Sequence, residues 1–160
     1  MNIKTDNQFG IDLGTTCSTL CQVKSRPTHD SKGCFVFEYV TFQGDRKTWP
    51  SVVASPINRG KPYEFCEQTE NKTKNLLSET KRLIGMSFDN PHVQELIAKN
   101  YFDWMKVVPD ANGTVMVEYD ECGVLVRKYP WEISAMILKY LHSNTCTHLY
   151  LDPATTTFNA

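Results

Sequence analysis

The sequence predicts an α/β fold in which strand-rich segments alternate along the chain with helical segments. Two observations support this prediction. Apolar and small residues occur in short extended runs over the first 54 residues, and apolar residues at helical spacing follow later in the chain. With 160 residues, 41% of them hydrophobic, the chain is long enough and apolar enough to bury a core.

Strands are expected first. Residues 9–13, 18–24 and 34–42 read as three strands, and "WPSVVA", residues 49–54, continues as a short extended piece. A helix is then expected over residues 71–85, ended by Gly85, because four apolar residues form one stripe at helical spacing. These four residues are Leu76, Leu77, Leu83 and Ile84.

In the second half of the chain a helix, three strands and a final helix are expected. Asn90 as N-cap and Pro91 at the first helical position begin a helix over residues 91–100. An antiparallel meander of three strands is expected next, and a final helix starts at Pro130 and reaches about residue 144. The meander strands are expected at residues 103–108, 113–119 and 122–129.

Charge and composition limit the partners and the compartment. The formal net charge of −1 gives no broad attraction to nucleic acid or to an anionic membrane surface, so we expect neither as a partner. No run reaches the roughly 18 apolar residues of a membrane span, and the polar N-terminus does not resemble a secretory signal. The six cysteines lack paired spacings and are expected to be reduced thiols in a cytoplasmic protein.

The stretch "FGIDLGTTC" carries a carboxylate and two hydroxyls at the end of the first strand. On a strand, Phe9 and Ile11 share one face and Asp12 faces the other way. Gly14 lets the backbone approach a ligand, and the amides and hydroxyls of Thr15 and Thr16 can bind phosphate. Because Asp12 would repel phosphate, a hydrated Mg²⁺ between them is needed. An ordinary β-turn with solvated threonines is the alternative.

Five segments in order resemble one family. They are "GIDLGTTCSTLCQV", "RKTWPSVVA", "TKRLIGMSFDNPHVQ", "WMKVVPDANGTVMVEY" and "YPWEISAMILKYL". Together they resemble the amino-terminal ATPase domain of the 70-kDa heat-shock chaperones, the DnaK family, from about residue 9 to the end. The resemblance implies a partial actin-like (ribonuclease H-like) ATPase lobe. Residues 1–54 and about 130–160 would form the partial core lobe, and about 55–129 a peripheral α+β subdomain.

The resemblance also implies the site residues. Gly14, Thr15, Thr16 and Cys17 would wrap the phosphates of ATP or ADP, with Cys17 acting through its backbone, and Asp12 would hold hydrated Mg²⁺. Lys81 would be the catalytic lysine that orients the attacking water and stabilises the γ-phosphate. In the expected helix, Lys81 lies at the edge of the apolar stripe and Arg82 points away. A lysine lying along a helix edge is the alternative.

The implied function is that of an amino-terminal fragment of an ATP-dependent protein-folding chaperone of the stress response. Its partners, through the full-length protein, would be unfolded polypeptide clients and co-chaperones. A non-catalytic truncated chaperone-like interaction module is the alternative, whereas a sugar-kinase-like phosphotransferase would not share the "KRLIG" segment. One departure is "GKPYEFCEQTENK", which replaces the family's usual residues before Lys81.

The family's second phosphate loop, adenosine-binding motif and peptide-binding domain follow the segments matched here. With one side of the nucleotide clamp, this chain alone is expected to hydrolyse ATP slowly or not at all. A steady-state assay of released phosphate on the purified chain measures this, and a turnover rate near that of an intact family member would contradict it.

Overall fold

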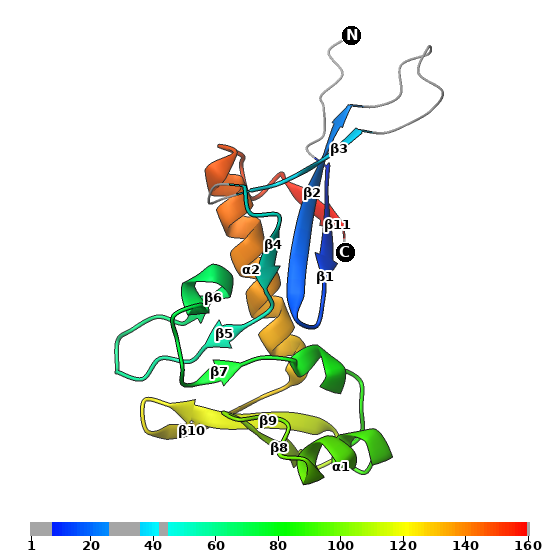
Figure 1. The fold of residues 1–160 in the computed structure, drawn as a ribbon, viewed down its shortest axis with the longest axis vertical. Helices are drawn as coiled ribbons and strands as arrows, with labels where there is room; N and C mark the ends of the chain where they lie inside the picture. The colour runs from blue at the N-terminus through cyan, green and yellow to red at the C-terminus, as the bar shows by residue number, and fades with distance from the viewer. Residues whose placement is uncertain (1–7, 26–35, 42–44, 160) are drawn as a thin grey trace.

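The computed structural model describes residues 8–25, 36–41 and 45–159, so the two ends of the strand expected at 34–42 lie outside the described residues (Figure 1). Within these ranges the chain forms three β-sheets and two α-helices. The α/β fold class predicted from the sequence is confirmed. The predicted division into a core lobe and a peripheral subdomain stays a prediction.

The first sheet contains the two strands that flank the glycine-threonine turn. Its strand order is β11-β1-β2-β3, with β4 also paired to β2, and all pairs are antiparallel except the parallel pair β1–β11. In β1, Phe9 and Ile11 are buried and Asp12 is exposed, as the alternation predicts. The strands are β1 (Gln8–Leu13), β2 (Cys17–Ser25), β3 (Val36–Tyr39), β4 (Thr48–Pro50) and β11 (Thr157–Asn159).

The other two sheets have three strands each. One has the order β6-β5-β7 and the other β10-β9-β8, all antiparallel. The second of these is the predicted meander, which is confirmed. The strands are β5 (Val53–Ala54), β6 (Glu64–Phe65), β7 (Leu76–Leu77), β8 (Lys106–Pro109), β9 (Val115–Glu121) and β10 (Val124–Lys128).

Both α-helices begin where the sequence predicts. Helix α1 (Pro91–Ala98) starts after Asn90, whose side chain accepts a hydrogen bond from the amide of His92 at 2.9 Å. Helix α2 (Pro130–His148) starts at its proline and is longer than predicted. Among the described residues, neither helix is long and apolar enough to cross a membrane.

The prediction of a helix over residues 71–85 is wrong. Strand β7 and the short 3-10 helix η2 (Thr80–Leu83) take its place, and a second 3-10 helix, η1 (Cys66–Thr69), precedes them. Asn75 and Glu79 both have positive φ, which interrupts a right-handed helix. Pairing of β7 with β5 satisfies the backbone there, so a tertiary contact outweighs the apolar spacing.

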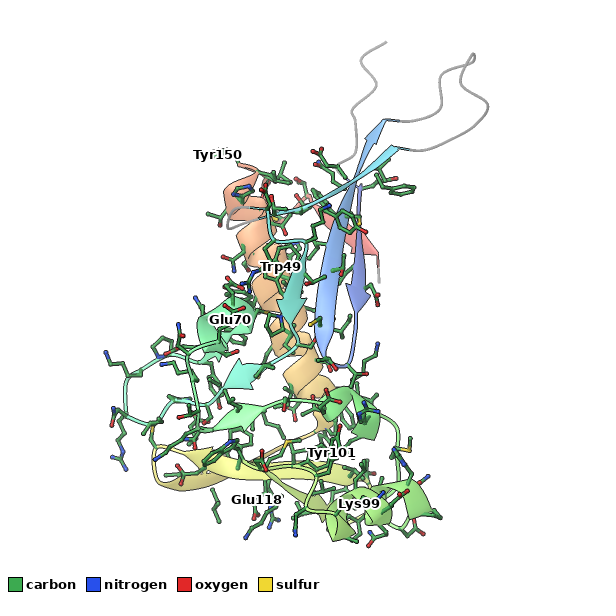
Figure 2. The ribbon with its side chains drawn as sticks, in the orientation of Figure 1. Trp49, Glu70, Lys99, Tyr101, Glu118 and Tyr150 are labelled. Carbon is green, nitrogen blue, oxygen red and sulfur yellow. The ribbon has the colours of Figure 1, made fainter. Side chains whose placement is uncertain are left out.

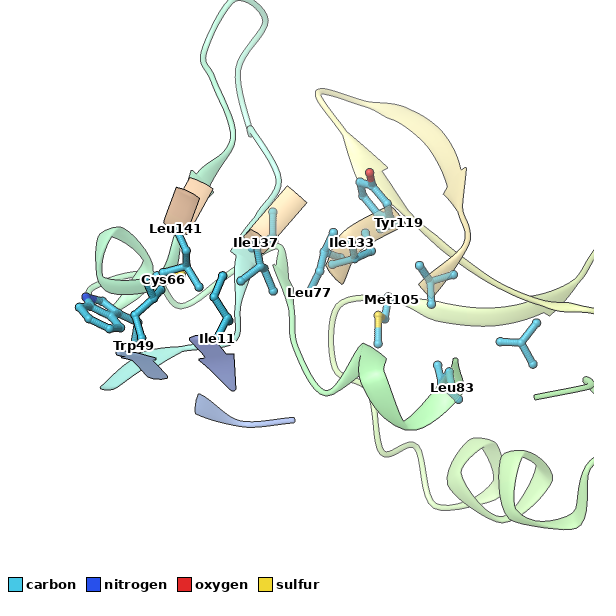
Figure 3. Close-up of a cluster of buried hydrophobic side chains, with 14 of the residues drawn as sticks. Ile11, Trp49, Cys66, Leu77, Leu83, Met105, Tyr119, Ile133, Ile137 and Leu141 are labelled. Carbon is cyan, nitrogen blue, oxygen red and sulfur yellow. The ribbon is translucent and has the colours of Figure 1, made fainter. Parts of the chain in front are cut away.

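Helix α2 supplies the centre of the core. Ile133, Ile137 and Leu141 recur every four residues along one face and are buried, in one cluster with Leu77 of β7 and Ile11 of β1. Figure 3 shows these side chains together. Burial against one helix therefore holds the three sheets around a continuous core.

Replacing Leu77 with alanine tests the packing of β7 in the core, because the Leu77 side chain is fully buried in one cluster with residues of α2. We expect Leu77→Ala to lower the free energy of unfolding by about 2–5 kcal/mol. Leu125→Ala is the matched control, since Leu125 is 69% exposed, and should change it by about 0.5 kcal/mol or less. Denaturant unfolding measures both, and equal losses would contradict the burial of Leu77 in the core.

Candidate phosphate-binding site

The candidate site is the turn of residues 14–16, which joins β1 to β2. Register pairing of Leu13 with Ser18 brings the two strand ends together around this 14–16 turn. The Asp12 side chain is exposed on the face opposite the core. Thr16 and Cys17 are also exposed. Polar groups thus gather at one accessible end of the hairpin.

Gly14 is required by a close approach of the backbone. A Cβ atom at this position would lie 2.0 Å from the carbonyl oxygen of Cys17, far inside van der Waals contact. The turn can therefore fold back on itself only with glycine. Lack of a side chain also leaves the backbone of the turn open to a ligand.

The segment after β4 holds the turn from one side. The Ser51 amide donates a hydrogen bond to the Thr16 carbonyl at 2.8 Å. The hydroxyls of Ser18 and Ser51 are buried and share a hydrogen bond of 2.8 Å. Ser51 thus fixes the backbone of Thr16 and the side chain of Ser18, both of which lie far from it in sequence.

Residues 79–82 hold the turn from the other side. The Thr16 hydroxyl donates to Oε1 of Glu79 at 2.9 Å. The Lys81 ammonium donates to the carbonyl of Leu13. We call residues 79–82 the 79–82 turn. Its two contacts lie on either side of Gly14 and Thr15, so it holds both ends of the 14–16 turn.

The carboxylate of Glu79 is the centre of a small network. Burial alone would raise the pKa of Glu79, but hydrogen bonds from Arg82 and Thr16 outweigh burial and lower it. The Arg82 Nε lies 2.6 Å from Oε2 of Glu79, and the Tyr101 hydroxyl donates to the same oxygen at 3.4 Å. Glu79 is therefore ionised at neutral pH and accepts from three donors.

The structure brings the predicted residues Asp12, Gly14, Thr15, Thr16 and Cys17 to one end of the hairpin and places the ammonium of Lys81 next to them. Their roles toward a ligand stay predictions. Carboxylate, hydroxyl and carbonyl oxygens are the donor set that suits a hydrated Mg²⁺. Among the described residues, no three His, Cys, Asp or Glu side chains gather as a metal cluster.

Glu79 is the residue that sequence reasoning missed. A helix over residues 71–85 would have pointed Glu79 and Lys81, two positions apart, in different directions. In the 3-10 turn that forms instead, both side chains reach the loop. The available signal was an acidic residue just before the lysine, and the wrong helix prediction obscured it.

A separate cavity of about 690 Å³ lies between the end of α1 and strands β8 and β9. Tyr101 and Trp104, both partly exposed, are among its aromatic lining residues. None of the predicted phosphate-binding residues lines it. Tyr101 connects it to the 79–82 turn through the contact with Glu79.

The mixed α/β fold around the bracketed hairpin is that of a partial actin-like ATPase lobe. A sequence model of the family described as Hsp70 protein matches residues 8–154. The chain therefore belongs to the Hsp70 family.

Three relatives illustrate the similarity. A ribosome-associated molecular chaperone of Eremothecium gossypii is 35% identical over 130 residues, 81% of this chain and 19% of the relative. A heat shock protein of Pyricularia oryzae is 31% identical, over 83% of this chain and 20% of the relative. The mitochondrial iron-sulfur cluster biogenesis chaperone of Saccharomyces cerevisiae is 30% identical, over 91% and 22%. The chain spans about a fifth of the length of these relatives.

A methyl group at residue 14 tests the close approach. We expect Gly14→Ala to lower the free energy of unfolding by about 1–3 kcal/mol, because its Cβ overlaps the Cys17 carbonyl oxygen. Gly10→Ala is the matched control in β1, the strand that leads into the turn, since nothing lies within 4 Å of a Cβ there, and its effect should be about 0.5 kcal/mol or less. Urea unfolding compares the two, and a Gly14→Ala protein as stable as wild type would refute the geometry.

Proposed function

We propose that this chain binds the phosphates of Mg-ATP or Mg-ADP through the 14–16 turn, as the first half of a nucleotide site in an ATP-dependent chaperone. The observation that carries the proposal is the hydrogen bond that the Lys81 ammonium donates to the carbonyl of Leu13, the residue immediately before Gly14. It supports convergence of a positive charge on a glycine-threonine turn from a distant part of the chain. That arrangement suits a polyanion.

Each residue has a distinct part in this proposal. The backbone amides of residues 14–17 and the Thr15 hydroxyl donate to phosphate oxygens. Lys81 has three donors, so it can keep its contact with Leu13 and still reach a phosphate oxygen. Asp12 accepts from water bound to Mg²⁺, and a bound Mg²⁺ neutralises phosphate charge. Lys81 also offsets the charge that develops on a transferred γ-phosphate.

In a longer protein we propose that this site serves the chaperone cycle, in which ATP binding and hydrolysis control the grip on unfolded polypeptides, assisted by co-chaperones. We place the protein in the cytoplasm and assign it to the stress response. Of the three relatives, one is named as ribosome-associated, one as a heat shock protein and one as mitochondrial. The five described cysteines are free, which fits a reducing compartment.

A non-catalytic interaction module is the second candidate function. The cavity beside α1, with Tyr101 and Trp104 partly exposed, favours it, because aromatic side chains are common at binding surfaces. The two functions differ in nucleotide binding. A chain that binds no Mg-ATP would support the interaction module.

Titration calorimetry of the purified chain with Mg-ATP tests the proposed function. We expect Lys81→Ala to weaken binding about tenfold or more, because one charge-assisted contact is lost. Removing Mg²⁺ with EDTA should weaken wild-type binding as well. Lys99→Ala is the matched control, since Lys99 lies directly after α1 (Figure 2), pairs with Glu95 of that helix and has no hydrogen bond or ion pair with the 14–16 turn. Equal affinity of wild type and Lys81→Ala would contradict the proposed site.

A further inference from the structure

Glu79 has a backbone conformation that needs an explanation. Its φ of 59° lies in the left-handed region, which is uncommon for a residue with a side chain. Such conformations persist where surrounding contacts determine them, and they cluster at functional sites. Here the contacts are made by the carboxylate, which accepts from Thr16, Arg82 and Tyr101.

The contact with Glu79 decides what the Thr16 hydroxyl can do. An ionised carboxylate only accepts hydrogen bonds, so the single hydroxyl proton of Thr16 points to Glu79 at 2.9 Å. The Thr16 oxygen is then left with acceptor capacity alone. Thr15 keeps its proton free for a phosphate oxygen, whereas Thr16 is set to accept from a water molecule, including one bound to Mg²⁺.

Arg82 controls the charge of the 79–82 turn. A bare carboxylate beside a triphosphate would repel it. The Arg82 guanidinium lies 2.6 Å from Glu79 and neutralises it, and the same guanidinium lies 5.9 Å from the centre of the Tyr101 ring. Lys81 thus supplies the net positive charge that the 79–82 turn presents to the 14–16 turn.

We propose that Glu79 is a positioning residue for phosphate binding: it orients the Thr16 hydroxyl as an acceptor and fixes the 14–16 turn, and Arg82 holds Glu79 in place. This inference deepens the proposed function and rests on it. It assigns a role to a contact between residues that are far apart in sequence. Glu79 acts through Thr16 and makes no contact with the phosphate itself.

A double-mutant cycle on the whole chain tests the inference. Affinity for Mg-ATP is measured by calorimetry for wild type, Glu79→Ala, Thr16→Val and the double variant. Each single variant should weaken binding about five- to tenfold, as for the loss of one hydrogen bond. The double variant should be no weaker than the weaker single variant, because both changes remove the same contact. Losses that multiply in the double variant would overturn the inference.

Two further variants separate positioning from general damage to the fold. Glu79→Gln keeps an oxygen that accepts from Thr16, so it should recover most of the affinity lost in Glu79→Ala. Glu118→Ala is the matched control, because Glu118 pairs with Arg127 at 2.8 Å with similar burial and lies on β9 (Figure 2). It should bind as wild type. A Gln variant as weak as the Ala variant would overturn the role given to the Thr16 contact.

A measurement without nucleotide keeps the inference separate from the proposed function. The Ser51 amide donates to the Thr16 carbonyl, so its hydrogen exchange, followed by NMR, reports on the position of Thr16. Glu79→Ala and Thr16→Val should each speed this exchange, and the double variant should exchange no faster than the faster single variant. Glu118→Ala should leave the exchange rate unchanged. If wild type binds no Mg-ATP, the proposed function fails while this exchange still tests Glu79. If wild type binds and neither affinity nor exchange changes in Glu79→Ala, only the inference fails.

Discussion

Burial of one face of α2 is the constraint on which the rest of the structure depends. Ile133, Ile137 and Leu141 are buried in the cluster that also holds residues of β1, β7 and β9. The strands of the sheet β6-β5-β7 have two residues each and bury too little apolar area for this sheet to be stable without the other two sheets. Packing on one helix gives the three sheets a common core, and η2 contacts the same helix. The 79–82 turn reaches the hairpin through this shared support.

The site is formed by three segments that are separate in sequence. The hairpin supplies the glycine, the hydroxyls and the Asp12 carboxylate, Ser51 holds the backbone of Thr16, and the 79–82 turn supplies the positive charge. Each contact uses a main-chain carbonyl or a short side chain, so small shifts of one segment would break it. Because Lys81 lies far from the hairpin in sequence, the fold and not the local sequence alone places its positive charge.

The parts of the fold set by local physics could be predicted from the sequence. Alternation in β1, the Asn90 cap and the proline at the start of α2 are local signals, and each element forms as predicted. Residues 71–85 could not be predicted in this way, because their strand depends on pairing with β5. The 14–16 turn is contiguous in sequence, so the sequence pattern indicates it. The contact of Glu79 with Thr16 depends on tertiary structure and on the positive φ of Glu79, so the sequence pattern does not indicate it.

Strand β1 has a neighbour from each side of the chain: β2 follows it directly, and β11 comes from the far end of the described residues. The hairpin can form early, since its strands are adjacent, whereas the parallel partner must wait until nearly the whole segment has been synthesised. Pairings between distant segments slow folding, and until then one edge of β1 exposes its backbone groups. On the ribosome, the nascent hairpin would thus expose the edge of β1 that later pairs with β11, and other strands could associate there. In the finished fold, Phe9 pairs in register with Phe158 at this edge.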